Sequence, residues 1–150
     1  MSTLSTPHPA VAGVDPRGPR VAATLTSVVL ALVLVTPAPL AAVLLAGQAF
    51  VFAVGAIRGV QHTPYSLIFR GLVRPRLGAP GELEDPRPPR FAQGLGLVFV
   101  LVALVGLLAG SATVGLVATG LALVAALLNA VFGLCLGCEL YLLLRRATVR

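Results

Sequence analysis

The chain contains two cysteines, Cys135 and Cys138, which are separated by two residues and followed directly by Glu139. A C-x-x-C pair is suited to thiol–disulfide exchange, because one thiolate attacks a substrate and the second resolves the mixed disulfide. On a regular helix the two cysteines lie about 60° apart, and Glu139 lies about 40° from Cys135. The spacing therefore predicts Cys135 and Cys138 as the exchanging pair, with Glu139 as the proton acceptor.

Two other interpretations of the cysteines remain open at this point, a metal pair and two small packing residues. A structural zinc site needs four ligands, and beyond these thiols and Glu139 the chain offers only His8 and His62. We therefore expect no metal and no other cofactor. An ionisable Glu139 close to lipid is costly and favours a functional role over simple packing.

The element that carries the cysteines decides how reactive they are. A thiolate is stabilised at the N-terminus of a helix and disfavoured near its C-terminus. The apolar segment at 114–144 is too long for one straight crossing of a bilayer, which needs about 20 residues. It must tilt strongly or break. If it breaks at Gly133, Cys135 begins a new helix; if it does not, the pair lies near a helix C-terminus.

The composition of the chain is that of an integral membrane protein. Of its 150 residues, 57% are hydrophobic and 11% are charged, whereas soluble domains carry about 25% charged residues. Arg17 and Arg20 precede the first apolar run, and hydrophobicity resumes directly after the first turn. We therefore expect a membrane span there rather than a cleaved secretory signal.

Four apolar segments follow a polar N-terminal segment at 1–20, and they form a single domain at 21–150. Short turns rich in Pro, Gly, Ser and Thr join the first segment to the second and the third to the fourth. The sequence thus predicts an all-α bundle of four transmembrane helices, arranged as two helical hairpins around a central loop at 58–90. The predicted helices are about 21–36, 40–57, 91–109 and 114–144.

Arginine supplies all the positive charge of the chain, whose net charge is +6. With four crossings, every arginine lies in the N-terminal segment, the central loop or the C-terminal tail, on one side of the membrane. The positive-inside rule makes that side cytoplasmic. We expect a multi-pass protein of the cell membrane with both termini in the cytoplasm. The positive charge of the chain is therefore explained by its orientation in the membrane. We expect no nucleic-acid partner.

The central loop contains a segment, 65–77, in which bulky apolar residues alternate with arginines about every four positions. This pattern is typical of a short amphipathic helix at the membrane interface. Arg70, Arg74 and Arg76 are predicted to contact lipid head groups or a cytoplasmic partner. The small-xxx-small pairs at 106/110 and 133/137 favour close helix packing, within one bundle or in a homo-oligomer.

Three stretches resemble a family of small bacterial, notably actinobacterial, four-helix membrane proteins that is catalogued as a domain of unknown function. They are V-D-P-R-G-P-R at 14–20, R-F-A-Q at 90–93 and G-L-C-L-G-C at 133–138. The resemblance extends from Val14 to Arg146. It implies an association with thioredoxin-like proteins or rhodanese-type sulfurtransferases, hence thiol or sulfur handling. Cys135 and Cys138 are the positions that it implies to be functional.

The leading hypothesis for function is a membrane thiol-redox or sulfur-relay accessory protein. A non-catalytic scaffold or assembly factor, which docks a partner through the arginine-rich loop, is one alternative. An oligomeric carrier of a small solute is another. The sequence offers no serine–histidine–acid set, no phosphate-binding glycine loop and no paired carboxylates within the membrane segments. Conventional enzyme and ion-coupled transporter functions therefore lack residues to perform them.

Overall fold

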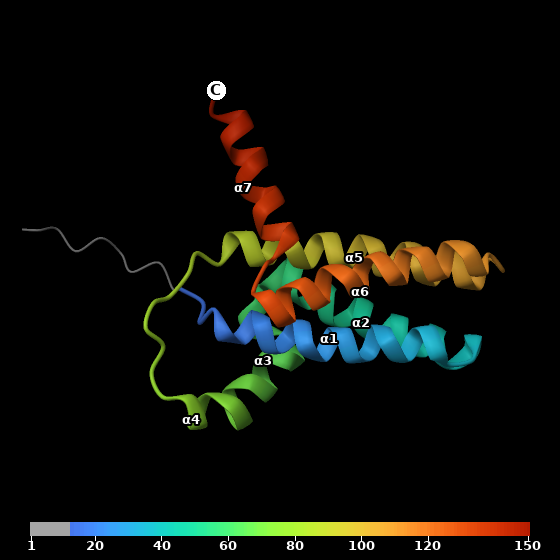
Figure 1. Ribbon diagram of the computed structural model, residues 1–150, viewed down its shortest axis with the longest axis horizontal. Helices are drawn as coiled ribbons and strands as arrows, with labels where there is room; N and C mark the ends of the chain where they lie inside the picture. Colours follow the sequence, from blue (N-terminus) through green and yellow to red (C-terminus); the bar gives the residue numbers. More distant parts are fainter. Residues whose placement is uncertain (1–12) are drawn as a thin grey trace, which may run out of the picture.

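The computed structural model describes residues 13–150 and consists of a bundle of long helices with shorter helical segments at one end (Figure 1). Residues 1–12, which include His8 and most of the predicted N-terminal segment, lie outside the described residues. Four helices are long and apolar enough to cross a membrane. The predicted all-α membrane bundle is confirmed. These helices are α1 (Arg17–Val35), α2 (Ala38–Arg58), α5 (Arg87–Leu108) and α6 (Ala112–Phe132).

Two tight turns join the long helices into hairpins. Pro37 precedes the first residue of α2, and its extended backbone reverses the chain after α1. Between α5 and α6, Gly110 adopts the left-handed region at φ +82°, and Ser111 Oγ accepts a hydrogen bond from the amide of Val114 at 3.4 Å. Both turns lie at the same end of the bundle, opposite the end at which α7 leaves it (Figure 1).

The hairpins pack so that α1 lies against α6 and α2 lies against α5. The most deeply buried apolar side chains between them are Leu30, Leu45, Val100 and Ala103. One buried amide lies among them. Gln48 is 1% exposed, and its Nε2 donates to Thr26 Oγ1 at 3.2 Å.

The first helix of each hairpin begins with the same pattern, D-P-R-x-P-R, at Asp15–Arg20 and again at Asp85–Arg90. In both copies the aspartate Oδ1 accepts a hydrogen bond from the amide of the arginine two residues on, at 3.0 Å in the first and 2.9 Å in the second. The residues before the two copies, Val14 and Glu84, form an isolated antiparallel bridge with two 2.9 Å hydrogen bonds. The two hairpins are thus parallel repeats related by an approximate twofold axis.

The last arginine of each copy binds the opposite hairpin. Arg20 donates to the carbonyl oxygens of Ala130 and Val131 at 3.1 and 2.8 Å, in the last turn of α6. Arg90 donates to the corresponding carbonyls of α2, which belong to Ala56 and Ile57. Carbonyls in the last turn of a helix have no partner within that helix. Each hairpin therefore caps the end of the other.

The central segment predicted as an amphipathic helix is helical throughout. It consists of α3 (Pro64–Ile68), the π-helical turn η2 (Phe69–Val73) and α4 (Arg74–Leu77), and it follows the 3₁₀ turn η1 (Val60–His62). The side chain of Phe69 is 3% exposed and packs over Gly18 of α1. We call the run from Pro64 to Leu77 the α3–α4 arm. It projects from the bundle on the side away from the C-terminal helix (Figure 1).

A carboxylate and an arginine fasten this arm to the bundle. Arg17 Nη2 pairs with Asp15 Oδ2 at 2.8 Å, and its guanidinium also donates to the carbonyls of Leu77 and Gly78, which end α4. The hydrogen bond from Arg17 holds the pKa of Asp15 below its ordinary value. Tyr65 attaches the other end of the arm, because its hydroxyl donates to Gln48 Oε1 at 2.8 Å.

Candidate functional site

The cysteines lie where the chain leaves α6 and turns into a separate helix, α7 (Leu136–Thr148). Gly133 adopts a left-handed conformation at φ +68°, and the amide of Leu134 donates to the carbonyl of Leu128 at 3.2 Å. This is the Schellman arrangement that ends helices. Of the two options left open for the segment 114–144, a tilted helix or a break at Gly133, the structure has the break: α6 ends at Phe132 and α7 begins at Leu136.

Two contacts fix α7 across the beginning of α5. A Cβ atom on Gly137 would lie 2.6 Å from Ala92 Cβ and 2.7 Å from Ala92 Cα, so the backbone of α7 touches α5 directly. One turn further on, the rings of Phe91 and Tyr141 are 5.6 Å apart and tilted by 50°. From this crossing α7 extends away from the bundle (Figure 1). Of the predicted pair at 133/137, one glycine therefore makes the turn and the other makes the packing contact.

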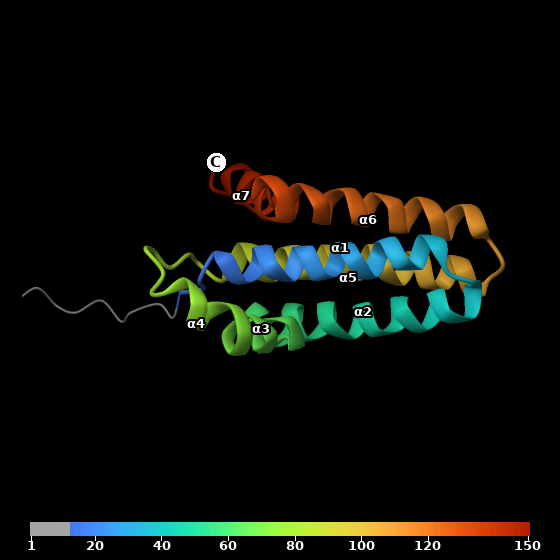
Figure 2. The same ribbon diagram turned by 60° about the horizontal axis from the view of Figure 1, so that its bottom comes forward.

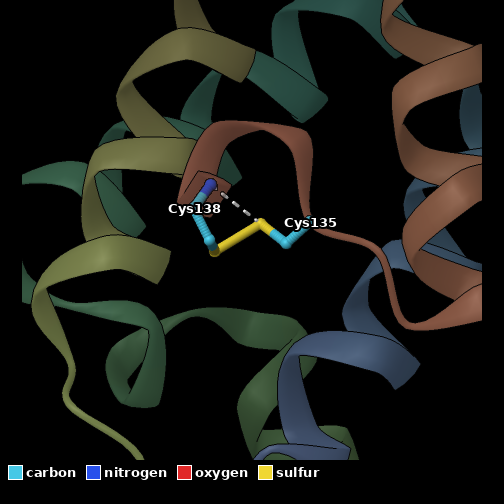
Figure 3. The surroundings of a disulfide bond; sticks show 2 residues. All are labelled: Cys135 and Cys138. Atoms are coloured by element: carbon cyan, nitrogen blue, oxygen red, sulfur yellow. Dashed lines mark hydrogen bonds between the residues drawn. A yellow bond between two sulfur atoms is a disulfide. The ribbon is translucent and has the colours of Figure 1, made fainter. Parts of the chain in front are cut away.

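Cys135 and Cys138 are joined by a disulfide across the first turn of α7, with their Cα atoms 5.2 Å apart (Figure 3). Cys135 is the N-cap residue, and its Sγ accepts a hydrogen bond from the amide of Cys138 at 3.4 Å. Both residues are half-buried. The pair thus lies at a helix N-terminus, where unpaired amides face the capping side chain.

This position bears directly on the chemistry of the sulfur atoms. Amide groups at a helix N-terminus stabilise a thiolate. When the disulfide is reduced, Cys135 is therefore the cysteine placed to act as the nucleophile. Cys138, one turn along the same helix, is within reach to resolve a mixed disulfide.

Glu139 lies in the same turn but makes no direct contact that identifies its role. Its amide donates to the carbonyl of Cys135 at 3.0 Å, while its side chain is exposed. Across residues 13–150, the carboxylate of Glu139 accepts no hydrogen bond and forms no ion pair. The negative charge of Glu139 in the first turn of α7 and the positive charges of Arg145 and Arg146 in its last turn both interact favourably with the helix dipole.

The arginines predicted to contact lipid or a partner lie on the α3–α4 arm, away from the cysteines. Arg70, Arg74 and Arg76 are exposed. Arg70 Nη2 also donates to the carbonyl of Gln61 at 3.3 Å. Their contact with head groups or a partner remains a prediction. Within the described part of the chain, there is no group of three or more His, Cys, Asp or Glu residues that could hold a metal ion.

The sequence interpretation missed the role of two arginines. The positive-inside pattern assigns Arg20 and Arg90 to orientation alone, whereas in the structure both cap helices of the opposite hairpin. The signal that could have found them is the repeated D-P-R-x-P-R pattern, which places both at the same position of a first helical turn.

The comparison with family profiles matches residues 14–146 to the family described as "Domain of unknown function (DUF4395)". The match begins at the residue that bridges to Glu84 and ends in the last turn of α7, so it covers the whole bundle. The chain belongs to this family. The predicted membership of a family of unknown function is confirmed. The searches of curated proteins and of solved structures gave no match.

Proposed function

We propose that this DUF4395 chain is a membrane thiol–disulfide exchange protein, in which Cys135 and Cys138 exchange electrons with the dithiol of a thioredoxin-like partner. One observation carries the proposal. Cys135 is the N-cap residue of α7, and its Sγ accepts a hydrogen bond from the amide of Cys138. Two cysteines used only for packing would not need a break in the helix to bring one of them to an N-terminus.

The exchange takes place in two steps. A thiolate of the partner attacks Cys135 Sγ, forms a mixed disulfide and expels Cys138 as a thiolate, which takes up a proton. The partner's second thiolate then attacks its own cysteine sulfur in that mixed disulfide and releases Cys135. Two electrons pass from the partner's dithiol to the pair, and the partner becomes a disulfide. The reverse sequence, begun by the Cys135 thiolate, reduces a partner.

Glu139 is proposed to exchange the proton with the Cys138 thiol, directly or through water. Its exposed carboxylate lies in the same helical turn and can be reached by solvent. The charge distribution supports a cytoplasmic position for this site. The arginines of the described chain lie at the end of the bundle from which α7 projects, and the positive-inside rule assigns that end to the cytoplasm.

The surface around the pair supports docking of a protein. Leu134 and Leu136 flank Cys135 and are 41% and 44% exposed. Anchoring of α7 through Gly137 holds the first turn in a fixed position on α5. A partner's dithiol therefore meets a rigid site with an apolar rim rather than a mobile tail.

The redox state of the pair in native membranes tests the proposal. Cells are quenched in acid and labelled with a thiol reagent that adds mass, with and without oxidant. We expect the wild type to shift between dithiol and disulfide. Cys138→Ser should accumulate a mixed disulfide between Cys135 and a partner, while the matched variant Cys135→Ser should trap much less.

Two results would contradict this mechanism. One is a pair that stays in one redox state in all conditions and is labelled only after denaturation. The other is equal trapping by the two serine variants, which would mean that the N-cap position confers no preference. Normal membrane insertion of both variants, checked by fractionation, is the required control.

A further inference from the structure

A groove of about 430 Å³ runs along the outer surface between the end of α2 and the first half of α5. Ala56 forms one wall, and the other residues are a stripe on α5 that includes Phe91, Gly94, Leu95 and Val98. The lining is almost entirely apolar. From Arg87 to Val98 the stripe is about 16 Å long. This is close to the thickness of one leaflet of the hydrocarbon core, about 15 Å.

Two guanidinium groups lie at the mouth of this groove. Arg90 donates to the carbonyls of Ala56 and Ile57, which carry no formal charge, so its own charge is not neutralised. Arg87 has a 64% exposed side chain, and Asp85 is 3.9 Å away. In the described structure no other carboxylate pairs with either arginine. The mouth therefore carries two positive charges and one negative charge.

The other hairpin does not offer the same arrangement. Its equivalent of Arg87 is Arg17, whose guanidinium is bound by Asp15 and by the carbonyls at the end of α4. Its equivalent of Gly94 is Thr24, whose hydroxyl donates to the carbonyl of Arg20. The approximate twofold symmetry is therefore broken here. Of the two hairpins, only the second has an exposed arginine, Arg87, at the start of a helix surface that Gly94 leaves uncovered.

We propose that this groove is a binding site for an anionic phospholipid, with one acyl chain along the α5 stripe and the phosphate at Arg87 and Arg90. Guanidinium groups bind phosphate through paired N–H donors. The apolar stripe on α5 below these arginines matches one acyl chain in length. A second groove, lined by apolar residues of α5 and α6 and by Thr113, has no charged residue and offers no such selectivity.

Native mass spectrometry of the full chain tests the proposal, with phosphatidylglycerol and phosphatidylcholine of identical acyl chains offered in equal amounts. We expect the wild type to retain phosphatidylglycerol about fivefold over phosphatidylcholine, the preference expected from one arginine near the head group. Arg87→Gln should weaken this preference. Arg146→Gln, at the exposed far end of α7, is the matched control and should keep it.

A second variant tests the groove itself. Gly94→Leu places a side chain in it, because a Cβ at this position has no contact within 4 Å apart from the neighbouring backbone of its own helix. It should lower retention of both lipids severalfold. Val98→Phe, from a side chain that is 56% exposed, tests the same point if Gly94→Leu does not fold. Unchanged preference in Arg87→Gln, an equal loss in Arg146→Gln or unchanged retention in both groove-filling variants would overturn the proposal.

Discussion

Arg20 and Arg90 make the same pair of hydrogen bonds in opposite directions across the bundle. Nε and Nη2 of each reach two successive carbonyls at the end of a helix in the other hairpin. Carbonyls without a partner are costly near a membrane, where water is scarce. The pair therefore joins the hairpins to one another at the end of the bundle that carries the cysteine helix.

Replacement of these arginines should destabilise the bundle. We expect Arg90→Gln and Arg20→Gln each to lower the free energy of unfolding by about 1 kcal/mol, the usual size for hydrogen bonds of this type when partly solvated. The double variant should be additive, because the two arginines share no acceptor. Unfolding in mixed micelles, followed by circular dichroism, measures the effect. Arg146→Gln serves as the control, and an equal loss in that variant would show that the effect is not specific to the caps.

The contact between Gly137 and Ala92 should not tolerate a larger residue. Gly137→Ala is expected to displace α7 from α5 and to cost about 1–3 kcal/mol, as overpacking generally does. Trypsin cleavage after Arg145 should then become faster. Gly120→Ala is the matched control, because a Cβ there meets no atom within 4 Å and alanine favours the helix. If Gly137→Ala behaves like Gly120→Ala, the two helices do not touch as described.

The hydroxyl of Tyr65 is expected to stabilise the α3–α4 arm. Tyr65→Phe leaves Gln48 Oε1 buried without its donor, which should cost about 1–2 kcal/mol. Tyr141→Phe is the matched control: in the described structure its hydroxyl makes no hydrogen bond, and its ring contact with Phe91 remains. Thermal unfolding of the two variants, in the same detergent, distinguishes them. Equal melting temperatures would contradict the role assigned to Tyr65.

The Asp15–Arg17 pair should make the arm sensitive to acid. Because the hydrogen bond from Arg17 lowers the pKa of Asp15 in the folded chain below its ordinary value of 3.8, the carboxylate stabilises the fold above that value. This contribution is lost as the pH falls through the lowered pKa. Asp15→Asn should therefore flatten the pH dependence of stability below about pH 4. Asp85→Asn is the control, because Asp85 is more exposed and its arginine holds no second segment; an equal effect would refute the assignment.

Much of the fold follows from features that are visible in the chain. Apolar segments of helical length and the one-sided arginines predict four crossings, and the turn residues predict the hairpins. The break at Gly133 could be named only as an option, since a glycine within a membrane helix is tolerated when its neighbours pack. Hydropathy alone does not distinguish a tilted helix from two helices. The small-xxx-small pair at 133/137 indicated a close helix contact, but the partner of Gly137, Ala92 of α5, depends on tertiary packing and has no local signal.

The candidate site was predicted in its residues but not in its geometry. The spacing of Cys135 and Cys138 identified the pair, and a stripe shared with Glu139 applies if the helix is continuous. The sequence left open a break at Gly133 that would make Cys135 begin a new helix. The structure has this break, and the Sγ of Cys135 accepts a hydrogen bond from the amide of Cys138. The repeated D-P-R-x-P-R pattern could have revealed the twofold arrangement, because equal positions in two copies imply equal roles.

The bridge between Val14 and Glu84 joins equivalent residues of the two repeats, so it lies on the axis that relates them (Figure 2 shows the hairpins in a second view). Such self-complementary pairing is the hallmark of an isologous homodimer. The bundle is therefore built like two identical subunits that have been fused into one polypeptide. Fusion allows the halves to diverge: Cys135 and Cys138 follow the second hairpin, whereas the residues after the first contain no cysteine. The cysteine-bearing helix α7 therefore occurs once in the chain, as a departure from an otherwise twofold arrangement.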